Sequence, residues 1–194
     1  MPRCVVFPCQ NFLEKPEYKR YITDRNLLRK LHNDVCWDNY VLIEVTLLTG
    51  EHIRIEINDG DFDPEKHKIK FTENSEMILE VDGKFPFGGM YSALPQKELK
   101  TVDININDRS VRTNINEYVN IYEPNFCNFG SHSRITEAYE DGENIYIYIF
   151  GGNAADSYFA KLIFHVTEGY ITSIISDYVP LSMYSSFGDH FIGF

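Results

Sequence analysis

The chain has 194 residues, of which 43% are hydrophobic and 14% aromatic, and its formal net charge is -11 at pH 7. The hydrophobic content excludes intrinsic disorder, and the length suits a single domain spanning 1–194. The negative charge excludes a general nucleic-acid-binding protein, because binding to phosphates depends on Lys and Arg.

The first ten residues, MPRCVVFPCQ, contain an apolar run that Pro8 interrupts, and this run is too short for a secretory signal. No run approaches the roughly 18 apolar residues of a membrane span. We therefore expect a cytoplasmic protein that does not bind membranes. The cysteines lack zinc-site spacing, and we expect buried or incidental thiols in preference to metal ligands or disulfides. The four are Cys4, Cys9, Cys36 and Cys127.

The segment ITDRNLLRKLHNDV, residues 22–35, has the pattern of an amphipathic helix. Thr23 or Asp24 can cap its start. Its apolar residues fall on one helical face and its basic residues on the other. The apolar set is Leu27, Leu28 and Leu31, and the basic set is Arg25, Arg29 and Lys30. We predict that residues 1–40 form an N-terminal helical segment.

After Trp37 the apolar residues recur every second position, which is typical of strands. Residues 41–83 are predicted to form a first hairpin portion that turns at Thr49 and Gly50. One face carries Val41, Ile43, Val45 and Leu47, followed by Ile53, Ile55 and Ile57. The outward residues of the second strand are His52, Arg54 and Glu56.

The run NDGDFDPE carries four closely spaced carboxylates that resemble a calcium loop. These residues are Asp59, Asp61, Asp63 and Glu65. Pro64 stands where an EF-hand loop needs Gly, and Lys70 stands where it needs a bidentate Glu. We interpret the run as a solvated turn, and we predict no metal and no other cofactor.

The Gly- and Pro-containing stretch 83–99 separates these strands from a second antiparallel portion, 98–194. Its predicted hairpins turn at Asn107–Asp108, Asp141–Gly142 and Glu168–Gly169. Strands follow one another without intervening helices. The predicted fold class is therefore mainly β, an antiparallel sheet or sandwich of hairpins with one N-terminal helix.

The strand NIYIYIF is apolar on both faces, since Tyr146 and Tyr148 alternate with isoleucines. Such a strand is either central and covered on both sides, or it presents an aromatic face to a partner. The loop GGNAADS that follows, residues 151–157, lacks the Lys of a phosphate-binding loop, and we interpret it as a connection between strands.

Charge is distributed unevenly along the chain. Residues 1–40 carry seven basic and five acidic side chains, whereas residues 113–194 carry two basic and ten acidic ones. A negative field of this kind attracts basic proteins. Tyr is also a favoured interface residue. The predicted partner-binding residues are Glu137, Glu140, Asp141, Glu143, Tyr146, Tyr148 and Asp156.

Several segments resemble uncharacterised cytosolic bacterial proteins of the polymorphic-toxin immunity type. These segments are DGKFPFGG, ELKTVDININ, NIYEPNF, GGNAADSYFAKLIF and SSFGDHFIGF. The resemblance covers roughly residues 76–194. It implies a non-enzymatic inhibitor that blocks a toxin's active site, and it carries over no functional residue.

Together these observations favour a protein-binding inhibitor that neutralises a basic toxin such as a nuclease, with no catalytic residues. One alternative is a small-ligand or carbohydrate-binding β-sandwich that uses Trp37 and exposed Tyr rings as stacking platforms. A third hypothesis is a hydrolase. It would combine Ser131 or Ser157 with His132 or His165, but the chain lacks a G-x-S-x-G nucleophile motif.

Overall fold

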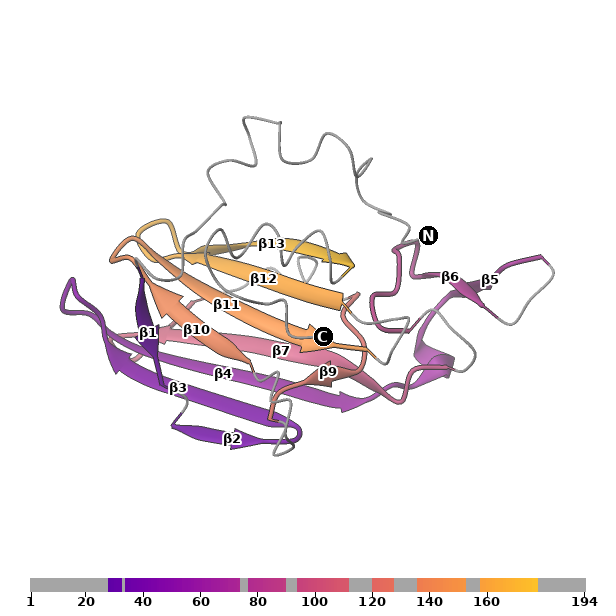
Figure 1. Ribbon diagram of the computed structural model, residues 1–194, viewed down its shortest axis with the longest axis horizontal. Coiled ribbons are helices and arrows are strands. Elements are labelled where there is room, and N and C mark those ends of the chain that lie inside the picture. The colour runs from indigo at the N-terminus through magenta and orange to yellow at the C-terminus, as the bar shows by residue number, and fades with distance from the viewer. Residues whose placement is uncertain are drawn as a thin grey trace, which may run out of the picture.

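Antiparallel strands make up nearly all the regular structure of this protein (Figure 1). The structure is a computed structural model that describes residues 28–32, 34–73, 77–89, 94–111, 120–127, 136–152 and 158–177. The predicted mainly β, antiparallel fold class is confirmed for these residues.

The first sheet has the strand order β2-β3-β4-β7-β8. Its strands are β2 (Val35–Trp37), β3 (Tyr40–Thr46), β4 (His52–Asp61), β7 (Lys97–Ile106) and β8 (Arg109–Val111). The β7–β8 hairpin pairs with β4, so it belongs with the first hairpin portion of the chain.

The second sheet has the order β1-β10-β11-β12-β13, and β9 pairs with the end of β11. Its strands are β1 (Arg29–Leu31), β9 (Pro124–Asn125), β10 (Glu137–Glu140), β11 (Asn144–Gly151), β12 (Tyr158–His165) and β13 (Tyr170–Asp177). A small third sheet at one end of the molecule pairs β5 (Ile69–Phe71) with β6 (Ile78–Val81), next to the short 3-10 helix η2 (Pro64–Lys66) (Figure 1).

The predicted hairpin turns are confirmed. Gly50, Gly142 and Gly169 lie between paired strands and have positive φ angles, which glycine adopts without steric cost. Asn107 and Asp108 also have positive φ angles, as a two-residue hairpin loop requires. The turn-forming residues Gly, Asn and Asp were therefore sufficient to locate these hairpins in the sequence.

The main core lies between the two large sheets, which stack on each other as a sandwich (Figure 1). The first sheet contributes Val41, Ile43, Ile53, Ile55, Ile57, Val102 and Ile104. The second contributes Ala138, Ile145, Ile147, Ile149, Ala160, Leu162 and Phe164. These are alternate strand residues, so the predicted inward faces are confirmed. Burial of each such aliphatic side chain stabilises the fold by roughly 1.5–3 kcal/mol.

The predicted N-terminal helix is wrong where the structure describes it. Residues 29–31 form strand β1, which pairs with β10 along Arg29↔Glu140, Lys30↔Tyr139 and Leu31↔Ala138. Leu31 points into the core and is 3% exposed. Pairing with a distant strand overrides local helical periodicity here. Residues 22–27 of the predicted helix lie outside the described residues.

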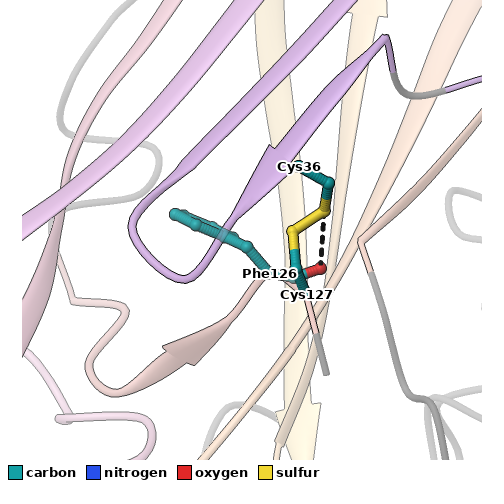
Figure 2. The surroundings of a disulfide bond; sticks show 3 residues. All are labelled: Cys36, Phe126 and Cys127. Carbon is teal, nitrogen blue, oxygen red and sulfur yellow. Dashed lines mark hydrogen bonds between the residues drawn. A yellow bond between two sulfur atoms is a disulfide. The ribbon is translucent and has the colours of Figure 1, made fainter. Parts of the chain in front are cut away.

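A disulfide joins the two sheets, contrary to the expectation of free thiols. Cys36 in β2 is bonded to Cys127, which follows β9 (Figure 2). The two residues are 91 positions apart in the sequence, and their Cα atoms are 5.8 Å apart, within the usual range for such bonds. Spacing alone did not reveal the pairing, because only the sandwich brings these segments together. Cys4 and Cys9 lie outside the described residues.

Candidate functional site

The acidic residues predicted to bind a partner lie around the β10–β11 hairpin, where most of them already have partners within the chain. Glu140 is 1% exposed and forms an ion pair with Arg29 of β1. Glu137 pairs with Lys30 at 2.5 Å and accepts a hydrogen bond from the Tyr139 hydroxyl at 3.1 Å. The two basic residues of β1 thus neutralise two of the predicted carboxylates.

Asp141 uses its carboxylate to build the hairpin turn. It accepts hydrogen bonds from the backbone amides of Glu143 and Asn144 at 2.9 and 2.7 Å, and from the Tyr146 hydroxyl at 2.6 Å. Burial raises the pKa of Asp141, but the bonds from Tyr146 and the two amides outweigh it and leave the pKa below its usual value. Burial and the bond to Asp141 raise the pKa of Tyr146. This carboxylate therefore has a structural role.

Tyr146 and Tyr148 lie in the interior, on strand β11 between β10 and β12. Their exposed fractions are 5% and 0%. The Lys161 ammonium, itself buried, lies 4.9 Å from the Tyr146 ring centroid and 5.6 Å from that of Tyr148. Tyr139 meets Tyr148 edge to face. This arrangement answers the question that the doubly apolar strand raised: the strand is covered on both sides.

Of the remaining predicted site residues, Glu143 is exposed at the hairpin tip and Asp156 lies outside the described residues. Among the described residues of the hairpin, Glu143 is therefore the exposed carboxylate whose side chain is not engaged by a described bond. The loop 151–157 joins β11 to β12, and these strands pair from Gly151↔Tyr158 to Asn144↔His165. For the hydrolase hypothesis, both candidate serines, Ser131 and Ser157, lie outside the described residues, as does His132, whereas His165 ends β12 opposite Asn144.

The carboxylates of the run NDGDFDPE have different partners and do not form one cluster among the described residues. Asp61 pairs with Lys97 at 2.7 Å. Asp63 pairs with Lys66 at 2.9 Å and accepts a hydrogen bond from the Glu65 amide that begins η2. Asp59 sits at a bulge of β4, and burial raises its pKa. Among the described residues no three Asp, Glu, His or Cys side chains are arranged to hold a metal ion.

The outer face of the first sheet brings aromatic and acidic side chains together. We call it the β2–β7 face and define it by Trp37, Asp38, Tyr40, Glu44, Arg54, Glu56 and Asp103. Strand pairing places Trp37 opposite Tyr40, Glu44 opposite Arg54, and Glu56 opposite Asp103. Apart from Asp38, which lies in a turn, these residues alternate with residues that point into the core, so they lie on the outer face. Tyr40, Arg54 and Glu56 are half-buried, and the others are exposed.

Trp37 is the most exposed aromatic side chain of the described residues, with 64% of its surface accessible. Its ring centroid is 6.2 Å from that of Tyr40, and the planes are inclined by 52°. Asp38 and Asn39 form the turn that joins the two aromatic residues, and both are exposed. The face therefore carries an aromatic corner beside an exposed carboxylate.

A row of polar contacts extends from this corner across the sheet. The Tyr40 hydroxyl donates to Glu56 at 3.0 Å, and Arg54 contacts Glu56 at 2.8 Å and Glu44 at 3.4 Å. The bond from Arg54 is the main reason that the pKa of Glu56 is lowered. Burial, followed by the contact with Glu56, raises the pKa of Tyr40. These contacts hold the aromatic and charged groups in a fixed arrangement.

The β2–β7 face is acidic overall. It carries four carboxylates, those of Asp38, Glu44, Glu56 and Asp103, and one guanidinium, that of Arg54, which contacts Glu44 and Glu56. The imidazole of His52 lies 3.3 Å from Glu44. Sequence reasoning placed Arg54 and Glu56 outward correctly. It missed their proximity to Asp103 because that depends on the pairing of β4 with β7, two strands far apart in the chain.

Comparisons with known proteins identify no relative: no protein-family model, curated protein or solved structure matches the chain. The resemblance to toxin-immunity proteins therefore stays a prediction. Within the described part of the chain, no helix has the length and apolar character needed to cross a membrane.

Proposed function

We propose that this protein is a non-catalytic inhibitor that binds a basic protein through the β2–β7 face, with a nuclease-like toxin as the most fitting target. The observation that carries the proposal is the exposed Trp37 beside a surface with four carboxylates and one guanidinium. Trp is the residue most enriched among interface anchors, and carboxylates select a partner rich in Lys and Arg.

The proposed mechanism has two steps. The negative charge of the chain first steers a basic partner toward the face, which accelerates association at low ionic strength. Trp37 is then buried against the partner, and carboxylates occupy positions where a nuclease binds substrate phosphates. This mechanism needs no catalytic group on the inhibitor.

The face replaces the β10–β11 hairpin as the favoured surface for a structural reason. Tyr146 and Tyr148 would have to leave the interior to contact a partner, and Glu137 and Glu140 would have to give up their ion pairs with β1. On the β2–β7 face, Glu44 and Glu56 also pair with Arg54. Trp37, Asp38 and Asp103 are exposed, however, and can meet a partner without leaving the interior.

The test compares two sets of matched charge changes. Tagged wild-type protein, Glu44→Gln/Asp103→Asn on the face, Trp37→Ala, and the control Glu143→Gln/Glu168→Gln at two hairpin tips are used to capture proteins from the native lysate over a salt series. We expect one basic protein to be retained by the wild type and the control, and to be released as salt rises. With that protein purified, Trp37→Ala should weaken binding by roughly 30-fold or more, the size expected of an interface anchor.

Three results would contradict the proposal. The captured protein could bind both face variants as tightly as the wild type. Its activity could be unchanged by a saturating amount of inhibitor. Finally, no basic protein could be retained at any salt concentration.

A carbohydrate-binding module is the second candidate, and the tilted Trp37–Tyr40 pair favours it, because sugar rings stack on exposed aromatic side chains. A glycan panel distinguishes the two functions. Binding to a glycan that Trp37→Ala abolishes, and that salt does not weaken, would support the carbohydrate function over the inhibitor.

A further inference from the structure

The disulfide is formed by the residue that precedes the exposed Trp37. Cys36 and Trp37 are consecutive in β2, so their side chains point to opposite faces of the sheet. Cys36 points inward, opposite Val41, and reaches Cys127 of the second-sheet side (Figure 2). Trp37 points outward. The covalent bond is therefore attached to the strand that presents the aromatic corner.

Apart from the disulfide, strand β2 is restrained by a short pairing with β3 and by bonds of the residues that flank it. The Asp34 amide donates to the Leu42 carbonyl, the Asp34 carboxylate accepts from the Glu44 amide, and the Asn39 carbonyl accepts from the Asp59 amide. Strand β2 is three residues long, it lies at the edge of the first sheet, and in the described part of the chain it pairs with β3 alone. A short edge strand held by so few backbone bonds opens easily. The disulfide connects it to a segment on the opposite sheet and removes that freedom.

The disulfide lies in a largely buried environment that also contains a hydrogen-bond acceptor for the reduced Cys36 thiol. Cys127 is 6% exposed and Phe126 is fully buried, so the bond is sheltered from solvent on that side. The sulfur of Cys36 lies 3.5 Å from the carbonyl oxygen of Phe126 (Figure 2). In the reduced protein the Cys36 thiol can donate a hydrogen bond to this oxygen. Reduction therefore leaves the Cys36 thiol with a hydrogen-bond acceptor in place.

We propose that the Cys36–Cys127 disulfide is a redox latch: it forms in an oxidising compartment and holds β2, and with it Trp37, in the geometry of the β2–β7 face. Persistent disulfides are characteristic of oxidising compartments, so the bond argues against the expected cytoplasmic location. The effect of the latch on partner binding rests on the proposed function. Its effect on the order of β2 does not.

The chemistry is thiol–disulfide exchange with a disulfide-donating oxidant, such as an oxidised dithiol carrier or oxidised glutathione. One cysteine thiolate attacks a sulfur of the donor, which forms a mixed disulfide and releases one donor thiolate. The second cysteine thiolate then attacks its partner's sulfur and releases the other. The two cysteines lose two electrons and two protons, and the donor takes them up as two thiols.

Peptide mapping of the full-length chain tests formation of the bond. The chain is expressed with export to an oxidising compartment, and free thiols are blocked with an alkylating agent before digestion without reductant. We expect a cross-linked peptide containing Cys36 and Cys127. Alkylation of both residues in every molecule would overturn the inference.

The latch itself is tested by hydrogen exchange and by fluorescence anisotropy, for which Trp37 is the single tryptophan of the chain. Addition of dithiothreitol should raise amide exchange in β2 by about tenfold or more and lower the anisotropy of Trp37, while β4 and β7 stay protected. Cys36→Ser/Cys127→Ser should match the reduced state and not respond to reductant. Cys4→Ser/Cys9→Ser should respond like the wild type.

Unchanged exchange in β2 on reduction would show that β2 does not need the bond. Loss of protection throughout β4 and β7 would mean that the bond stabilises the whole fold, which also contradicts a local latch. If Trp37 loosens on reduction but the oxidised protein captures no partner, the latch stands and the proposed function fails.

Discussion

The two outer faces of the sandwich are built from similar strands but have opposite environments. On the first sheet, the residues that alternate with the core are polar and exposed, as in Glu44, Arg54 and Asp103. On the central strands β11 and β12 of the second sheet, the corresponding side chains are mostly aromatic or aliphatic and buried, as in Tyr146 and Tyr148, and the two Tyr rings lie beside the ammonium of Lys161. The first sheet therefore offers a surface, whereas the centre of the second sheet is buried on both sides.

An acidic segment therefore need not present carboxylates that a partner can bind. The C-terminal half carries most of the net negative charge, yet Glu137, Glu140 and Asp141 are engaged by Lys30, Arg29 and the hairpin itself. On the first sheet the excess of acidic over basic side chains is smaller, but Asp38, Glu44 and Asp103 are exposed. Availability depends on partners that only the folded chain brings together.

Replacement of one aromatic residue in each sheet should give the largest difference in the free energy of unfolding. Tyr148→Ala removes a fully buried ring from the second sheet and should lower the free energy of unfolding by about 3–5 kcal/mol. Trp37→Ala removes an exposed ring and should change it by less than about 0.5 kcal/mol. Urea denaturation of both variants measures the difference.

Equal destabilisation by the two substitutions would contradict the assignment of one face to the interior and the other to the surface. Circular dichroism at low denaturant concentration serves as the control that both variants begin from the folded state.

Asp141→Asn tests whether a predicted partner-binding carboxylate is in fact structural. The variant weakens three hydrogen bonds within the hairpin and should cost roughly 1–3 kcal/mol of stability at pH 7. Glu143→Gln, two residues away and exposed, is the matched control and should have an effect within about 0.5 kcal/mol. An Asp141→Asn variant as stable as the wild type would refute the structural role.

The same variant has a defined pH dependence. The pKa of Asp141 is lower in the folded protein than its usual value of about 3.9, so its stabilising effect is complete above the unfolded-state pKa. That effect is lost as pH falls through the folded-state pKa. The stability difference between wild type and Asp141→Asn should therefore shrink as pH is lowered from about 5 toward 2. A difference that stays constant over this range would contradict the assignment.

The exposed ion pair of the first sheet should give the smallest effect. Glu56→Gln removes the main bond to Arg54 and should cost less than about 1 kcal/mol, and added salt should reduce the effect further. Asp103→Asn, opposite Glu56 on the neighbouring strand, is the control for loss of one negative charge. A cost above about 2 kcal/mol for Glu56→Gln would contradict the description of Arg54–Glu56 as a surface ion pair.

Part of the candidate site could be predicted from the sequence. Alternation placed Arg54 and Glu56 outward, and Trp37 stood out as the single tryptophan. The choice of the β10–β11 hairpin as the binding surface depended on whether Tyr146 and Tyr148 are exposed. Their alternation with isoleucines is compatible with either environment, so the pattern did not decide it.

After Trp37, the sequence was sufficient to predict the hairpin turns and the strand residues that face the core. Those features depend on neighbouring residues, through the two-residue period and the turn-forming glycines and asparagines. The tertiary structure alone decided that residues 29–31 form a strand, that β7 pairs with β4, and that Cys36 bonds to Cys127. These outcomes depend on contacts between segments far apart in the chain, and no local pattern records which distant segment will be the partner.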